Sequence, residues 1–135
     1  MTGKPNFADG GLKLFTTFLE KLSELIQACP KASYIKFRRS DGALKLVAVY
    51  DKEAISDDLY IASADDWHEL ASYWLPLLDI VVRRELNDIA AIEDPQSQFF
   101  EWRIHVNTDE VSSYLTRKTK TIIEKVYAAM KALDP

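Results

Sequence analysis

The sequence predicts a single α+β domain in which an antiparallel sheet of about four strands packs with three helices. Two β-rich stretches are joined by Asp41-Gly42, a dipeptide typical of tight hairpin turns. Apolar residues recur at helical spacing before this hairpin and in two later stretches, and an alternating stretch lies between those two. Strands joined by a tight turn favour an antiparallel sheet over a doubly wound parallel one. The expected order is α-β-β-β-α-β-α, with residues 1–10 as a flexible tail and residues 11–135 as the domain.

The first helix is expected to run from Leu12 to about Ala28. Its large apolar residues recur every three or four positions, which places them on one helix face: Phe15, Phe18, Leu19, Leu22, Leu25 and Ile26. Charged residues lie elsewhere on the helical wheel. Pro30 then ends the helix, because the residue before a proline is pushed away from helical geometry.

The hairpin register follows from its turn. If Asp41 and Gly42 form a type I′ turn, Ser40 faces Ala43 and every later pair is fixed. One face then becomes core and includes Ile35, Phe37, Leu46 and Ala48, while the other is solvated and basic and includes Tyr34, Lys36, Arg38 and Lys45. A third strand is expected over Leu59–Ser63.

The stretch "DDWHELASYW" (residues 65–74) is predicted to open a long second helix. Asp66 and Glu69 have the spacing of a capping box, and the helical pattern continues to about Glu93 with a kink near Pro76. Trp67 and Trp74 are seven residues apart, nearly two helical turns, so both are expected to leave one helix face and to anchor it in the core.

The stretch "QFFEWRIHVN" (residues 98–107) alternates between apolar and polar residues and predicts a half-buried strand. Trp102 lies on its apolar face, and Glu101, Arg103 and His105 point to the other side. Asn107, with Glu110 three residues later, is expected to cap a third helix, whose apolar stripe extends to the end of the chain.

Several classes of site are disfavoured by what the sequence lacks. Cys29 is the single cysteine, so no intrachain disulfide can form and a reducing compartment is expected. No apolar stretch is long enough to span a bilayer or to act as a secretory signal, which favours a cytoplasmic protein without membrane contact. No cofactor is expected, because glycine-rich phosphate-binding motifs are absent. A zinc-protease helix would need a second histidine four residues after His68, where Ser72 stands.

The charge distribution divides the chain into a basic and an acidic part. Residues 31–50 carry five basic residues and one acidic residue, whereas residues 51–101 carry 13 acidic and three basic residues. An acidic surface repels nucleic acid and attracts basic protein partners. Nucleic-acid binding through hairpin residues 34–45, with Tyr34 as a stacking platform, is therefore only an alternative, because the sequence pI is about 5.2.

These observations predict a non-enzymatic protein-binding module of the inhibitor, immunity-like or chaperone-like kind, which also self-associates as a homodimer. The expected contact residues are apolar positions beyond those that the sheet can cover, in helix two (Tyr73, Leu77, Ile80) and in helix three (Tyr114, Ile123, Tyr127). An alternative is a small enzyme with a site near Glu101, Arg103 and His105, since an acid, a cation and a titratable base share one strand face.

Overall fold

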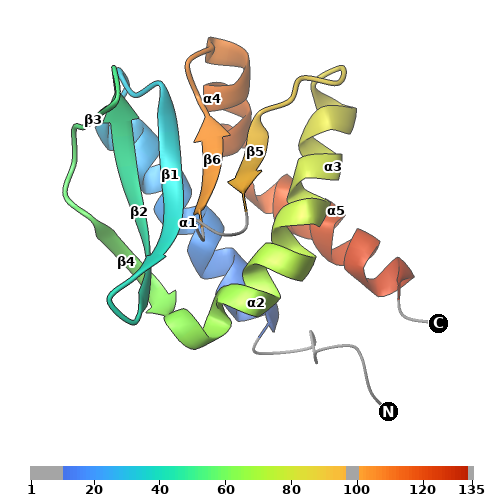
Figure 1. The fold of residues 1–135 in the computed structure, drawn as a ribbon. Coiled ribbons are helices and arrows are strands. Elements are labelled where there is room, and N and C mark those ends of the chain that lie inside the picture. Colours follow the sequence, from blue (N-terminus) through green and yellow to red (C-terminus); the bar gives the residue numbers. More distant parts are fainter. Residues whose placement is uncertain (1–10, 97–100, 134–135) are drawn as a thin grey trace.

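The computed structural model describes residues 11–96 and 101–133, which form one antiparallel sheet and the helices packed on it (Figure 1). The strands are β1 (Tyr34–Ser40), β2 (Ala43–Tyr50), β3 (Glu53–Ala54), β4 (Leu59–Ser63), β5 (Ile92–Gln96) and β6 (Glu101–His105). The helices are α1 (Leu12–Ala28), α2 (Trp67–Glu69), α3 (Leu75–Glu85), α4 (Asp109–Arg117) and α5 (Thr119–Ala132). The predicted α+β class is confirmed, but the sheet has six strands instead of about four.

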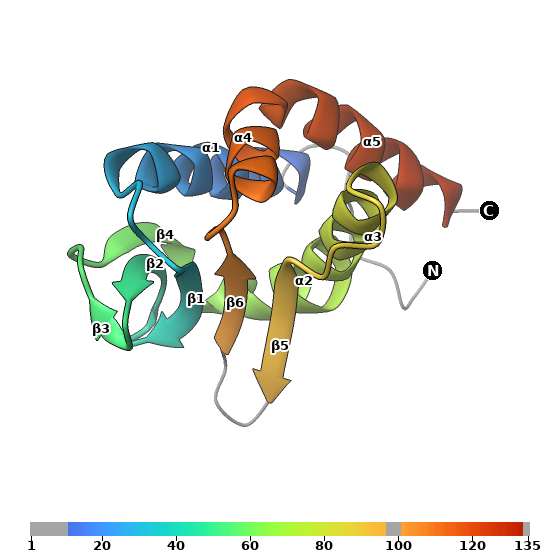
Figure 2. The ribbon, with the colours of Figure 1, turned by 90° about the horizontal axis from the view of Figure 1, so that it is seen from above.

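The molecule has two layers. The strands follow the order β3-β2-β1-β6-β5, and β4 also pairs with β2. Seen from above, α1, α3, α4 and α5 lie on one side of the sheet, and no described helix covers the other side of β1 and β6 (Figure 2). The strand predicted from the alternating stretch, β6, lies inside the sheet, since it pairs with both β1 and β5.

The hairpin register is confirmed. Ser40 pairs with Ala43, and Asp41 and Gly42 have φ values of 54° and 76°, as a type I′ turn requires. The core face of the hairpin is also confirmed, because Ile35 and Phe37 are fully buried. Part of the other face is less solvated than predicted, since Val47 and Val49 are buried as well.

The core is held together by aromatic contacts between elements that are distant in sequence. The ring of Phe15 in α1 stacks on Trp74, with centroids 4.9 Å apart. Phe18, also in α1, meets Phe37 of β1 edge-on at 5.0 Å, and Phe37 in turn stacks on Trp67 at 5.2 Å. These contacts fix α1 and the start of the second helical segment against the same part of the sheet.

The second helical segment differs from the prediction in three respects. Its capping box does not form: Asp66 makes no capping bond, and Glu69 Oε2 accepts a hydrogen bond from Trp74 Nε1 at 3.0 Å. The segment ends at Glu85, well before Glu93, because Asn87 has a positive φ and the Asp88 N–H donates to the Arg83 carbonyl, as at a Schellman end. Residues 86–91, which were expected to extend this helix, lie outside any helix, and Ile92 and Glu93 begin β5.

A π-helical turn over Leu70–Trp74 separates α2 from α3, and the chain changes direction there in both views (Figures 1 and 2). The Leu75 N–H donates to the Leu70 carbonyl, five residues back, just before Pro76, which has no N–H to donate. The two tryptophans of this segment anchor it in the core: Trp67 stacks on Phe37 of β1, and Trp74, at the end of the wide turn, stacks on Phe15 of α1.

The predicted third helix is two helices, α4 and α5, with a break at Lys118. Its cap is Thr108, not Asn107: the Thr108 side chain accepts a hydrogen bond from the Val111 N–H at 3.3 Å. The break changes the direction of the chain, so α4 packs against α1 while α5 packs against both α1 and α3. The helices α1, α3, α4 and α5 thus meet on the side of the molecule away from the sheet's uncovered face.

Candidate functional site

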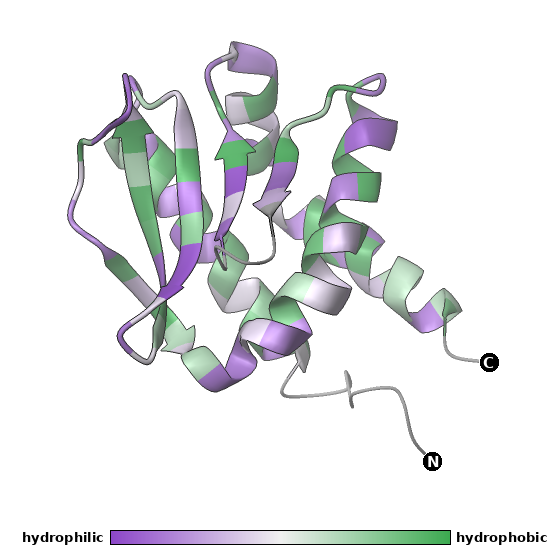
Figure 3. Cartoon of the chain, viewed as in Figure 1, coloured by the Kyte–Doolittle hydropathy of each residue, from purple (hydrophilic) through white to green (hydrophobic). Residues whose placement is uncertain are grey.

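The uncovered face of the sheet brings together two groups of residues that are far apart in sequence. Pairing of β1 with β6 sets Tyr34 opposite His105, Lys36 opposite Arg103 and Arg38 opposite Glu101. The basic side of the hairpin and the predicted polar patch are therefore one surface, and the alternation that creates it is visible along β1 and β6 in Figure 3. We call it the open sheet face, made of Tyr34, Lys36, Arg38, Lys45, Tyr60, Glu93, Glu101, Arg103 and His105.

Most charges on the open sheet face are paired with one another. Arg103 Nε lies 2.8 Å from Glu101 Oε2, and this hydrogen bond raises the pKa of Arg103. Lys45 Nζ lies 3.8 Å from Asp58 Oδ2, which is also 4.0 Å from Arg38 Nη2. Asp58 thus offsets part of the positive charge that the sequence concentrates in the hairpin. Within the described residues, Lys36 makes no such ion pair.

The polar patch predicted from the alternating strand gains a fourth member, Glu93 of β5. His105 Nε2 lies 2.8 Å from Glu93 Oε1, and the His105 ring lies 5.7 Å from the Tyr34 ring. The guanidinium of Arg103 sits 5.4 Å from the centroid of the same tyrosine ring. The expected stacking platform is thus already covered by a cation from the neighbouring strand.

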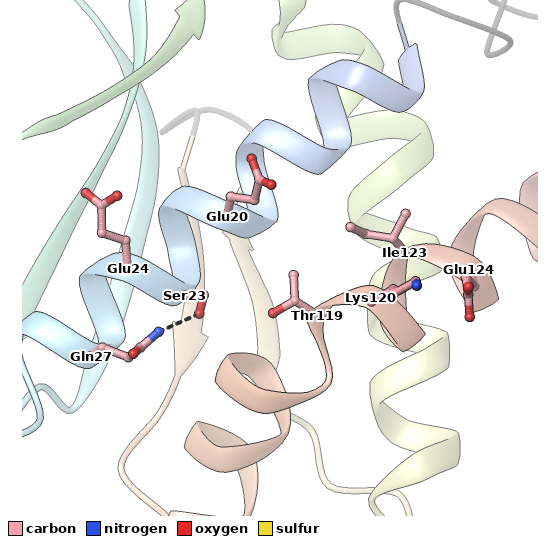
Figure 4. Close-up of a pocket in the computed structure, with 8 residues that line it drawn as sticks. All are labelled: Glu20, Ser23, Glu24, Gln27, Thr119, Lys120, Ile123 and Glu124. Carbon is pink, nitrogen blue, oxygen red and sulfur yellow. Dashed lines mark hydrogen bonds between the residues drawn. The ribbon is translucent and has the colours of Figure 1, made fainter.

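A second surface lies between α1 and α5, where a groove of about 730 Å³ is open to solvent (Figure 4). We call it the α1–α5 groove, and its lining residues are Glu20, Ser23, Glu24 and Gln27 from α1, and Thr119, Lys120, Ile123 and Glu124 from α5. The α1 members recur at helical spacing on the side of α1 that faces away from the core. The α5 members come from its first two turns, directly after the break at Lys118.

The floor of the groove is apolar and its rim is acidic. Ile123 is half-buried and points from α5 into the space between the helices (Figure 4). Glu20, Glu24 and Glu124 are exposed, and none of them forms an ion pair with a described residue. Lys120 is the single cation among the lining residues. The groove therefore carries three carboxylates against one ammonium group.

One buried polar group also lines the groove. The side chain of Ser23 is 8% exposed, and its hydroxyl oxygen accepts a hydrogen bond from Gln27 Nε2 at 2.9 Å. Among the described residues, nothing accepts the hydroxyl proton. Ser23 is thus able to donate a hydrogen bond to a group placed in the groove.

The predicted contact residues are spread over the helical layer. In the second helical segment, Tyr73 is half-buried, Leu77 is only 8% exposed and Ile80 is 46% exposed. Tyr127 is half-buried beneath Lys131, whose Nζ lies 5.5 Å from the ring centroid. Among the six predicted positions only Ile123 lines the α1–α5 groove.

Tyr114, the remaining predicted contact residue, has a buried hydroxyl without a hydrogen-bond partner in the part of the chain that the structure describes. Burial, followed by the nearby carboxylate of Glu85, raises the pKa of Tyr114 to about 12. That carboxylate is itself 2.8 Å from Lys125 Nζ of α5. Tyr114 therefore belongs to the packing between helices and not to the rim of the groove.

Sequence reasoning missed the acidic residues of the groove. Glu20 and Glu24 have the spacing of a solvated helix side, which most amphipathic helices possess. They line a groove only because α5 lies beside them, and the position of α5 follows from the break at Lys118. The spacing of Glu20 and Glu24, one turn apart with the same charge, is the one local signal that could have drawn attention to this side.

Comparison with known proteins adds no assignment: no protein-family model matches the chain, and neither a curated protein nor a solved structure is similar to it. In residues 11–96 and 101–133, no three His, Cys, Asp or Glu side chains are grouped so that they could hold a metal ion. No helix within those ranges has the length and apolar character needed to cross a membrane. Function must therefore be inferred from the open sheet face and the α1–α5 groove.

Proposed function

We propose that this protein is a non-enzymatic, cytoplasmic protein-binding domain and that the α1–α5 groove holds a segment of its partner. The observation that carries the proposal is the combination of a half-buried apolar floor at Ile123 with rim carboxylates that have no ion-pair partner among the described residues. Peptide-binding grooves between helices use an apolar floor for affinity and rim charges for orientation and selection. The size and acidic charge of the chain fit an inhibitor, an immunity-like protein or a chaperone.

The test replaces the floor of the groove. Ile123→Arg puts a charge where the partner's apolar side chains would lie, so binding should be lost while the fold is kept, because the site is only half-buried. Partners are captured from an extract of the source organism, identified by mass spectrometry, purified and measured by calorimetry against the wild type and the variant.

Ile55→Arg is the matched control, since Ile55 is an exposed isoleucine outside the groove and outside α3. A purified partner that binds the Ile55 variant normally and the Ile123 variant at least tenfold more weakly would support the proposal. Equal binding to both variants would show that the groove is not part of the binding site. Failure to reconstitute any complex from purified components would remove the proposed function itself.

Self-association is a separate part of the proposal. A homodimer would use α3, where Ile80 is the exposed member of the apolar positions predicted for helix two. Light scattering at micromolar concentration should then give twice the mass of one chain, and Ile80→Arg should return it to one. A mass of one chain for the wild type would contradict the dimer without touching the groove.

The second candidate is the small enzyme, favoured by the pair of His105 with Glu93. A carboxylate that holds a histidine in place next to a tyrosine and an arginine is an arrangement that general acid–base chemistry uses. Against it, His105 does not line either described groove, and no serine or cysteine accompanies it on the open sheet face. Hydrolysis assays with generic ester and phosphate substrates, with His105→Gln as the control, would reveal such an activity.

We do not extend the proposal to nucleic acid. Binding through the hairpin would need free cations and an accessible ring, whereas Lys45 and Arg38 approach Asp58 and Arg103 covers the Tyr34 ring. A salt-sensitive mobility shift with labelled single-stranded oligonucleotides would contradict this choice.

A further inference from the structure

We infer that the partner segment held by the α1–α5 groove is a cationic amphipathic helix, with apolar side chains on Ile123 and lysine or arginine side chains at the acidic rim. This inference rests on the proposed function and names the chemistry of the partner. It follows from the charge of the groove, from the shape of its walls and from the pairing of charges elsewhere on the molecule.

Charge is the first argument. Glu20, Glu24 and Glu124 surround the groove without an ion-pair partner in residues 11–96 and 101–133. Glu85, which lines the groove between α3 and α5, is by contrast paired, because it lies 2.8 Å from Lys125. The rim of the α1–α5 groove is thus a local excess of negative charge, to which a cationic segment is complementary.

The arrangement of the walls is the second argument. Glu20, Glu24 and Gln27 lie on successive turns along one side of α1, and Lys120 and Glu124 lie one turn apart on α5. A helix laid between α1 and α5 would present side chains at the same repeat, so its charged residues would meet the rim once per turn. Lysine and arginine also have long aliphatic stems, which can cover the apolar floor while their charged ends reach the rim.

Ser23 provides a third contact that does not depend on charge. Its hydroxyl proton has no acceptor among the described residues, and the side chain is 8% exposed at the groove wall. A polar group of the partner segment placed above Ser23 would accept that proton. The groove therefore offers anionic and hydrogen-bonding contacts from α1 and an apolar contact from the facing turns of α5.

A second copy of this chain is a poor occupant. Several of its basic side chains already have partners: Arg38 and Lys45 approach Asp58, and Arg103 is bonded to Glu101. Using these side chains in the groove would require those pairs to be broken.

The experiment uses a defined probe with the full-length protein. The probe is a 14-residue peptide, acetylated and amidated, with leucines at helical spacing (i, i+3, i+4, i+7) and lysines at the polar positions, on the order of four turns long. Its counterpart carries glutamate in place of every lysine. Binding is measured by fluorescence anisotropy, and the contact surface is mapped by ¹⁵N chemical-shift changes.

The protein variants separate the groove from general attraction between an acidic protein and a basic peptide. The groove variant is Glu20→Gln, Glu24→Gln, Glu124→Gln, and its control is Glu53→Gln, Asp57→Asn, Glu110→Gln, which changes the net charge equally at exposed positions outside the groove. The lysine peptide should bind about tenfold more weakly to the groove variant and nearly normally to the control. Shifts should fall on residues 20–27 and 119–124.

Equal weakening by the groove variant and its control would show that attraction is non-specific and would overturn the inference. Shifts on the open sheet face, or equal binding of the glutamate peptide, would overturn it as well. These failures differ from failure of the proposed function. If the purified partner still needs Ile123 but binds through an acidic or uncharged segment, the protein-binding role stands and only the cationic chemistry is wrong.

Discussion

The open sheet face and the α1–α5 groove both carry charged side chains, but those on the sheet are largely paired with each other and those at the groove rim are not. Side chains on one face of a sheet are held at short distances along a strand and between strands, which lets Glu101 meet Arg103 of its own strand and lets Glu93 of β5 meet His105 of β6. Glu20 and Glu24 lie one helical turn apart with the same charge and cannot satisfy each other. A surface whose charged side chains already form ion pairs with each other attracts a charged partner only weakly. A surface with unpaired carboxylates favours a partner of positive charge.

Substitution of a core residue that supports both the open sheet face and the α1–α5 groove should have the largest effect on the free energy of unfolding. Trp74→Ala removes a fully buried ring that stacks on Phe15 of α1, so the free energy of unfolding should fall by about 3–5 kcal/mol. Trp102→Ala should cost less, because Trp102 is only half-buried. Urea denaturation followed by circular dichroism measures both, and a larger loss in the Trp102 variant would contradict the burial pattern.

The hairpin turn supports the open sheet face but not the groove. Gly42 has a φ of 76°, and a Cβ added at this position would meet nothing within 4 Å, so Gly42→Ala introduces backbone strain without a steric clash. We expect a loss of about 1 kcal/mol in the free energy of unfolding. Amide shifts should change along β1 and β2 and remain unchanged in residues 119–124, and shifts of equal size in α5 would show that the two surfaces are coupled.

Alkaline titration probes the packing behind the groove. The folded state raises the pKa of Tyr114 from 10.0 to about 12, so the folded protein holds this proton more tightly than the unfolded chain. The stabilisation is present below pH 10 and should be lost as the pH rises toward about 12.

The control is Tyr114→Phe, which removes both the titration and a buried hydroxyl that lacks a described partner. At pH 7 this variant should be as stable as the wild type or more stable by up to about 1 kcal/mol. Its free energy of unfolding should fall less steeply between pH 10 and pH 12, as measured by urea denaturation at each pH. An equal slope for both proteins would show that other groups cause the alkaline loss.

The smallest effects give the most direct comparison of the two surfaces. Glu101→Gln breaks the bond with Arg103 and should lower the free energy of unfolding by about 0.2–1 kcal/mol. Glu20→Gln removes a like-charge neighbour of Glu24 and should leave stability unchanged or raise it by about 0.2–0.5 kcal/mol. Opposite signs in thermal denaturation at low salt would support the contrast, and a stability loss in the Glu20 variant would show that its carboxylate has a structural role.

Local rules were sufficient for part of this fold. Asp41-Gly42 sets the hairpin register because only two adjacent residues with positive φ close such a turn, and no distant contact is needed to see it. The burial of Trp74 follows equally from its place on an apolar stripe. The strand residues of β6 were recognisable from alternation alone, although Phe99 and Phe100 of the predicted strand lie outside the described residues.

Distant contacts decided what the sequence did not reveal. Ile92 and Glu93 lie at the end of the stretch whose pattern predicted a helix, and they belong to β5 because Asn87 ends the helix and β6 offers an edge to pair with. The break at Lys118 has no proline or glycine to announce it. The groove could not be predicted for the same reason, since its two walls are residues 20–27 and 119–124, which are brought together only by the packing of α1 against α5.

The π-helical turn over Leu70–Trp74 gives this protein a place where its chain could lose one residue. A π-helical turn holds one residue more than an α-helical turn, so one deletion there would convert the wide turn into an ordinary one and leave α3 in nearly the same rotational position relative to α2. Trp67 would keep its place on β1, and the buried positions of α3, such as Leu78, would still face the core. A deletion in the middle of α3, by contrast, would rotate every later residue by about 100° and exchange the inside of that helix for its outside.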